Sequence, residues 1–180
     1  QGQKQPDTLL LLALHPDLFD ARVKLANWDY YEPTTQHGSS LSPSIHASLA
    51  AQLGMRYKAE QYFQHCIRLD QDNINGDSGA GIHIANCAGA WLAMTQGFAG
   101  LNYQPGVLSV NPIMPLEWTS IHLKLMIQGV QYGFECETGR VRVTRLAVLD
   151  EDAAREPLVF RTAGRDYCFA DDEQSLTIEC

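Results

Sequence analysis

The chain has 180 residues, a formal net charge of −8, 45% hydrophobic and 19% charged residues. A chain of this length forms one domain or two small ones and buries a sizeable core, so disulfides are not needed to explain its stability. The negative charge argues against a nucleic acid or an anionic membrane as partner, because both need a basic surface. It fits a neutral substrate, or a small anion held in a local pocket.

The first hundred residues carry a helical apolar pattern. Asp20 can cap the second helix, Pro33 ends it, and Ser42-Pro43 can start the third with Ser42 as cap and Pro43 in the first turn. The last helix is almost wholly apolar, so we expect it to be buried on most sides, with Trp91 in the core. Helices are predicted over residues 7–14, 21–31, 44–53, 57–69 and 82–94, with a polar loop over 70–81.

From about residue 100, apolar residues alternate with period two, which is typical of β-strands with one face in solvent. This half predicts an antiparallel sheet, arranged as a sandwich. The fold class is therefore α+β. Strands are predicted over residues 121–127, 130–136, 141–146, 158–161, 167–169 and 176–178.

The five cysteines are scattered, odd in number and never in a C-x-x-C pair. This favours buried free thiols in a reducing cytoplasm over a disulfide framework or a zinc site. The apolar run Leu9–Leu14 is too short to span a bilayer and lacks the basic flank of a signal peptide. The polar start at Gln1, without an initiator Met, indicates the middle of a longer protein.

The most unusual segment is His37-Gly38-Ser39-Ser40, which leads into a helix start. Backbone N–H groups and the helix dipole favour an anion there, the serines add O–H donors, and Gly38 allows close approach to the backbone. His37 can donate from one ring nitrogen while a partner orients the other. By pattern alone, a capping loop with a surface histidine is the more common interpretation.

Other polar residues have structural alternatives. Lys4-Gln5 can reach sugar hydroxyls or a phosphate, or belong to a solvated terminus. Asp29 and Glu32 could pair as glycosidase carboxylates, but solvation at a helix end or hydrogen bonding to the loop is favoured.

His83 is expected to be a satisfied core histidine. The acidic residues of the 70–81 loop do not match an EF-hand spacing, so no metal is expected there.

Several motifs occur together in one order: Lys4-Gln5-Pro6-Asp7, Asn27-Trp28-Asp29-Tyr30-Tyr31-Glu32-Pro33, His37-Gly38-Ser39-Ser40-Leu41-Ser42, and Gly81-Ile82-His83-Ile84-Ala85 through Gly97-Phe98. Over residues 3–136 the chain resembles glycoside hydrolase family 65, which contains maltose, trehalose and kojibiose phosphorylases. The resemblance implies that residues 1–102 are the last helices of an (α/α)6 catalytic barrel, and that residues 103–180 form a C-terminal β-sandwich domain.

The resemblance also implies a reaction, the inverting phosphorolysis of an α-glucoside. Inorganic phosphate is then the co-substrate, no other cofactor is needed, and a glutamate protonates the leaving oxygen. His37, Gly38, Ser39 and Ser40 would bind phosphate, and Lys4 and Gln5 would contact the substrate. The catalytic glutamate is expected upstream of this chain, so we expect the isolated chain to be inactive and to associate with the missing N-terminal part or to form a homo-oligomer.

Pro6, Thr34 and Gln36 depart from the residues usual in the family, which weakens any inference about the sugar. The segment between Pro33 and Pro43 has no carboxylate, which favours phosphate over an activated water, although Glu32 just outside it keeps a hydrolase of the same family possible. The remaining alternatives are a helical interaction module, for which no repeat is found, and a carbohydrate-binding sandwich.

Overall fold

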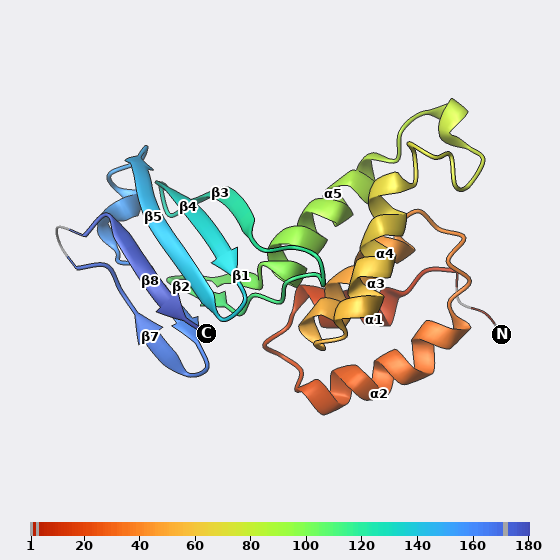
Figure 1. Ribbon diagram of the computed structural model, residues 1–180, viewed down its shortest axis with the longest axis horizontal. Coiled ribbons are helices and arrows are strands. Elements are labelled where there is room, and N and C mark those ends of the chain that lie inside the picture. The colour runs from red at the N-terminus through yellow and green to blue at the C-terminus, as the bar shows by residue number, and fades with distance from the viewer. Residues whose placement is uncertain (1, 3, 171–172) are drawn as a thin grey trace. The chain divides into compact units, whose positions relative to one another are not determined.

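The computed structural model describes residues 2, 4–170 and 173–180 of the chain; Gln1 and Gln3 of the polar start lie outside the described residues. The chain divides into two compact units, a helical unit over Gln1–Phe98 and a β unit over Ala99–Cys180 (Figure 1). Helices and sheets are segregated along the chain, which makes the fold α+β.

The helical unit is organised around one buried helix, α3, which contacts α1, α4, α5 and η3. The third and fourth helices begin one or two residues earlier than predicted, and the first two have the predicted bounds. The elements are α1 (Asp7–Leu14), α2 (Ala21–Tyr31), η1 (Glu32–Thr34), α3 (Ser42–Gln52), α4 (Arg56–Arg68), η2 (Ser78–Ala80), α5 (Ile84–Leu92) and the π-helical turn η3 (Ala93–Phe98).

Small side chains allow the other helices to approach α3 closely. A Cβ added at Gly89 of α5 would lie 2.2 Å from Ser44 Oγ, and one added at Gly97 of η3 would lie 3.1 Å from Ser48 Cα. Nine residues of α3 are buried: Ser42, Pro43, Ser44, His46, Ala47, Ser48, Leu49, Ala50 and Ala51. The first turn of α3 is thereby fixed in the interior of the unit.

Two helix-start predictions have different outcomes. Asp20 is the N-cap of α2, because its Oδ1 accepts a hydrogen bond from Val23 N at 2.9 Å. The prediction for Ser42 was wrong: the N-cap of α3 is Leu41, and Ser42 is the first helical residue. The Ser42 hydroxyl contacts two histidine rings instead of capping the helix.

The prediction that the last helix is buried on most sides was also wrong. Asn86 is the only residue of α5 that is buried, and Trp91 is 47% exposed. The apolar face of α5 lines an open groove with α1 and α3, whose walls include Leu10, Leu14, Ile45, Ala88 and Leu92. An apolar sequence shows that a surface favours burial, but burial itself needs a covering element, and none of the described residues fills this groove.

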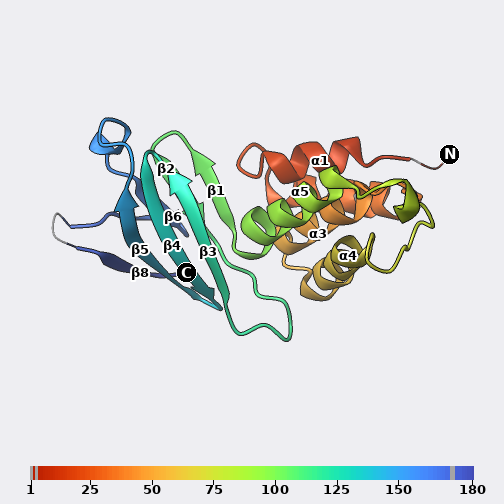
Figure 2. The ribbon, with the colours of Figure 1, turned by 90° about the horizontal axis from the view of Figure 1, so that it is seen from above.

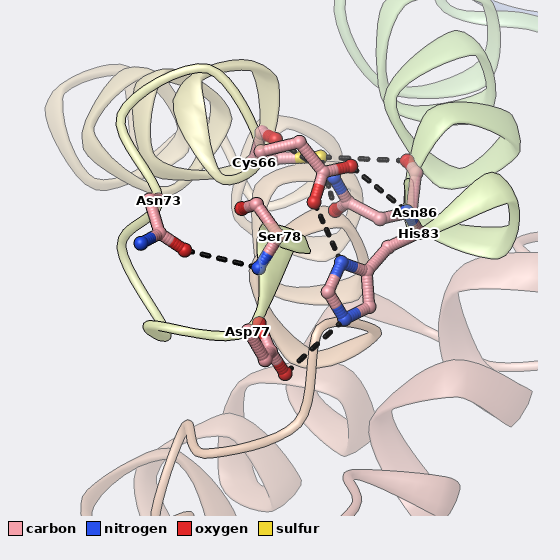
Figure 3. A network of polar contacts seen from close by, with 7 residues as sticks. Cys66, Asn73, Asp77, Ser78, His83 and Asn86 are labelled. Carbon is pink, nitrogen blue, oxygen red and sulfur yellow. Dashed lines mark hydrogen bonds and ion pairs between the residues drawn. The ribbon is translucent and has the colours of Figure 1, made fainter. Parts of the chain in front are cut away.

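The polar loop after α4 is attached to the start of α5 by His83 (Figure 3). Asp70 Oδ1 lies 2.6 Å from His83 Nδ1, Asp70 Oδ2 accepts from His83 N at 2.9 Å, and Asp77 Oδ2 lies 3.5 Å from His83 Nε2. His83 is therefore satisfied, but it is the partly exposed N-cap of α5 and not a core histidine as predicted. Among the described residues, no group of three or more acidic, His or Cys side chains is arranged to hold a metal ion.

The β unit contains two four-stranded sheets, with strand orders β1-β2-β6-β7 and β3-β4-β5-β8 (Figure 2). Among the described strands, all pairings are antiparallel except that of β2 with β6, which is parallel and corrects the prediction of a purely antiparallel arrangement. The strands are β1 (Leu101–Gln104), β2 (Val107–Val110), β3 (Ile121–Ile127), β4 (Val130–Glu137), β5 (Arg140–Val148), β6 (Val159–Thr162), β7 (Arg165–Tyr167) and β8 (Ser175–Glu179), with the short helix η4 (Ala153–Arg155) after β5.

β1 and β2 form a hairpin that was not predicted from the sequence. The signal was present: Pro105-Gly106 joins the two strands, and Gly106 has φ 79, a left-handed conformation that glycine adopts without a steric penalty. The two sheets of the unit contact each other through aromatic rings, since Tyr132 of β4 lies 5.9 Å from Phe160 of β6 between ring centroids.

The cysteines are free in the structure, but only Cys66 and Cys136 are buried. Cys87, Cys168 and Cys180 are exposed, so the prediction of buried thiols was wrong for these three. Within the described part of the chain, no helix has both the length and the apolar character needed to cross a membrane.

Candidate anion-binding site

The segment between η1 and α3 places donor groups at the surface. Gly38 is exposed, and a Cβ added to it would have no atom within 4 Å. Ser39 and Ser40 are partly exposed, and none of the described residues accepts a hydrogen bond from the N–H groups of Gly38, Ser39 and Ser40. We call residues 37–40 the anion loop. Its free N–H and O–H groups, next to the start of a helix, suit an anion.

The loop is closed by its own polar contacts. Ser42 N donates to Ser39 O at 3.0 Å, and Leu41 N approaches Ser39 Oγ at 3.4 Å. These bonds turn the chain into α3.

The His37 side chain points into the helical unit instead of into solvent. Its Nδ1 lies 2.9 Å from Ser42 Oγ, and its Nε2 lies 3.3 Å from Tyr62 Oη on α4. Its ring centroid is 4.6 Å from that of His46 and 5.2 Å from that of Tyr62. Burial lowers the pKa of His37, against the opposing effect of the Glu32 carboxylate. His37 is therefore a neutral, internally bonded side chain at pH 7.

Glu32 is the last residue in this series of contacts, after His37 and Tyr62. Its Oε1 accepts from Tyr62 Oη at 3.1 Å and from Lys58 Nζ at 2.9 Å. Burial raises the pKa of Glu32, but the hydrogen bonds from Lys58 and Tyr62 and the Lys58 charge outweigh it, so the net pKa is lowered. The prediction of helix-end solvation or hydrogen bonds to the loop was wrong for this carboxylate, because its donors come from α4.

A buried histidine lies behind the anion loop. His46 is fully buried, and burial lowers its pKa to about 4, so it is neutral at pH 7. Its Nδ1 lies 2.8 Å from the carbonyl oxygen of Ser42, and its Nε2 has no partner among the described residues. Trp28 packs edge-on against the His46 ring, with centroids 5.5 Å apart.

The N-terminal segment contacts the residue before the anion loop at Gly2. A Cβ added at Gly2 would lie 2.6 Å from Gln36 Nε2, so the backbone at Gly2 is in contact with the residue before His37. Lys4 and Gln5 follow in this segment and are exposed, and no hydrogen bond joins either of them to another described residue. Lys4 and Gln5 therefore remain predicted substrate contacts.

Sequence reasoning missed the residues that support the loop: Ser42 as a ring partner, His46, Lys58 and Tyr62. One signal was available, since Lys58 and Tyr62 lie four residues apart and therefore share one helix face. That face could not be matched to Glu32 and His37 before the packing of α4 was known.

Comparisons with known proteins identify relatives of the chain. Residues 1–92 match the sequence profile of the glycosyl hydrolase family 65 central catalytic domain. The chain is 45% identical to a maltose phosphorylase of Bacillus subtilis over 64% of the chain and 15% of that protein. It is 36% identical to a kojibiose phosphorylase of Halothermothrix orenii over 91% of the chain and 21% of that protein.

A solved structure shows the same fold. It is of a protein assigned as a kojibiose phosphorylase from the human microbiome, with a TM-score of 0.84 and 30% identity, and it covers 98% of this chain and 25% of that one. The chain thus spans about a fifth of the length of the curated relatives that it matches. Because the family profile covers more than half of the chain, the chain belongs to glycosyl hydrolase family 65.

Proposed function

We propose that this chain is part of an inverting disaccharide phosphorylase and supplies its phosphate-binding loop. The observation that carries the proposal is the anion loop, in which exposed Gly38 and partly exposed Ser39 and Ser40 offer N–H and O–H donors beside the internally bonded His37 ring. His37, Gly38, Ser39 and Ser40 form this loop. The curated relatives named above are phosphorylases, which use phosphate as the second substrate.

The loop suits phosphate because phosphate is already a nucleophilic anion. Such a nucleophile needs to be positioned and its charge compensated, and it needs no carboxylate base. N–H and O–H donors supply these contacts without a proton transfer.

The nearest carboxylate supports phosphorolysis over hydrolysis. A hydrolase needs a base to activate water, and Glu32 is the closest candidate in the sequence. Its carboxylate is occupied by Lys58 and Tyr62 and its pKa is lowered, so it is a poor proton acceptor.

In the proposed architecture, residues 1–102 are the last helices of an (α/α)6 barrel and residues 103–180 are a C-terminal β-sandwich domain. The open apolar groove between α1, α3 and α5 supports it, because the remaining barrel helices would cover exposed apolar side chains such as Leu14 and Leu92. Lys4 and Gln5 would contact the substrate, as the resemblance to the family implies.

The general acid of the reaction would come from residues outside these 180. Two measurements test the proposal. In an NMR titration with inorganic phosphate, we expect the backbone amides of residues 38–40 to shift and saturate while chloride at equal ionic strength leaves them unmoved. Incubated with phosphate and maltose, trehalose or kojibiose, the 180-residue chain should release no β-glucose 1-phosphate; turnover by this chain alone would contradict the assignment of the acid.

A further inference from the structure

The His37 ring has no free nitrogen, although the anion loop begins at this residue. Both ring nitrogens have protein partners, Ser42 on one side and Tyr62 on the other. The backbone of His37 has φ 51, a left-handed conformation that is unfavourable for a residue with a Cβ. The bonded ring, packed between His46 and Tyr62, holds the backbone in this conformation.

The direction of each hydrogen bond around His37 follows from Glu32, the residue at one end of this series of bonds. The Glu32 carboxylate only accepts, so Tyr62 Oη uses its single hydrogen on Glu32. Tyr62 Oη must then accept from His37 Nε2–H. A neutral imidazole carries one N–H, so His37 Nδ1 accepts from Ser42 Oγ–H.

The hydrogen bonds of His46, at the other end of the series, agree with this direction. The carbonyl oxygen of Ser42 only accepts, so His46 Nδ1 carries the hydrogen and also faces Ser42 Oγ at 3.3 Å. Ser42 Oγ can accept there because its own hydrogen is directed to His37. His46 Nε2 is left as a bare lone pair, in agreement with its lack of a partner among the described residues. Burial keeps both rings neutral, since it lowers both pKa values.

We propose that Glu32, Tyr62 and Ser42 are positioning residues that hold His37 as a neutral Nε2–H imidazole under the anion loop. The loop then offers phosphate its backbone N–H groups and the Ser39 and Ser40 hydroxyls, and the His37 ring is an anchor and not a ligand. This inference rests on the proposed phosphate function of the loop. It adds the tautomer of each ring, the order of the bonds, and a role for Tyr62 on a different helix.

The test uses the 180-residue chain labelled with 15N-histidine and long-range 1H–15N spectra of the rings. We expect His37 to be protonated on Nε2 and His46 on Nδ1 near neutral pH, and both tautomers to persist when inorganic phosphate saturates the loop. In Tyr62→Phe, His37 Nε2–H loses its acceptor, so its ring signals should move towards a mixture of tautomers. The phosphate dissociation constant should rise about three- to tenfold, as for one lost neutral hydrogen bond.

Tyr57→Phe is the matched control. Tyr57 lies on the same helix, is 63% exposed, and its hydroxyl accepts from Gln61, so its loss should change neither the ring signals nor the affinity. Glu32→Gln keeps an oxygen acceptor for Tyr62 and should give a smaller change in the same direction. It perturbs the ring without touching the loop, and it replaces Tyr62→Phe if that variant does not fold.

Three results would overturn the inference: a His37 protonated on Nδ1, unchanged ring signals in both variants, or ring nitrogens of His37 that shift as far as the loop amides when phosphate is added. If the tautomers are as expected but the loop amides do not respond to phosphate, the positioning stands and the phosphate function falls. The two proposals therefore fail in distinguishable ways.

Discussion

The close packing of α5 on α3 can be tested at Gly89. A Cβ at this position would lie 2.2 Å from Ser44 Oγ and 2.7 Å from Ser44 Cβ. Rotation of the Ser44 side chain can move its Oγ but not its Cβ. In Gly89→Ala the two helices must therefore separate by about 1 Å to restore an ordinary carbon–carbon contact of about 3.5–4.0 Å.

The expected change in stability is the balance of two effects. Overpacking of a well-packed contact costs about 1–3 kcal/mol. The overlap here involves two atoms, one of them fixed to the backbone, so a cost of about 3 kcal/mol is expected. Alanine gains about 1 kcal/mol over glycine in a helix interior. We therefore expect Gly89→Ala to lower the free energy of unfolding by about 2 kcal/mol.

Urea denaturation followed by circular dichroism measures this difference. Gly79→Ala is the control, because a Cβ there has no atom within 4 Å, and it should change the stability by less than about 0.5 kcal/mol. In the double variant Gly89→Ala/Ser44→Gly the methyl group has room, so a double-mutant cycle should show favourable coupling of about 1–2 kcal/mol. Equal stability of Gly89→Ala and Gly79→Ala, or a cycle without coupling, would refute the close contact.

Three further predictions concern the anion loop, the contacts of His83 with Asp70 and Asp77, and the thiols. Gly38→Ala should leave the stability within about 0.5 kcal/mol, because its Cβ meets no atom. It should weaken phosphate binding about tenfold, as for one charge-assisted hydrogen bond; unchanged affinity in an NMR titration would show that the anion does not approach Gly38. The hydrogen bond to Asp70 raises the pKa of His83, and the bond to His83 lowers the pKa of Asp70. The stabilisation from His83 is complete below the ordinary histidine pKa of about 6.5, and it is lost as pH rises through the raised pKa of His83. The stabilisation from Asp70 is complete above the ordinary aspartate pKa of about 3.8, and it is lost as pH falls through the lowered pKa of Asp70. Hydrogen exchange of the 70–81 loop, corrected for its intrinsic pH dependence, should therefore accelerate above neutral pH in the native chain and not in His83→Gln. Identical pH profiles of the two proteins would contradict a stabilising contact between His83 and Asp70. Burial raises the pKa of Cys66 and Cys136 to about 12 each, so a thiol reagent should modify these two only after denaturation. The thiols expected to react in the native chain are the exposed Cys87, Cys168 and Cys180. Modification of Cys66 or Cys136 at the same rate as these three would contradict their burial.

The sequence by itself located most helices and strands, because the signals for them are local. The Asp20 cap acts within one turn of α2, and the alternation in β3 and β4 follows from the geometry of a strand. It also carried the motifs from which the family was inferred and the free donors of residues 38–40, which depend on a short loop before a helix. The turn at Pro105-Gly106 was equally local and was overlooked.

The tertiary structure decided what the loop rests on and what remains uncovered. His37 and Tyr62 are 25 residues apart, and Glu32 and Tyr62 are 30 apart, so their bonds exist only because α4 packs beside α3. No local pattern determines such a pairing, and it changed the expected role of the His37 ring. The exposure of α5 has a similar cause: its sequence determined an apolar surface, but burial depends on whether another element packs against that surface.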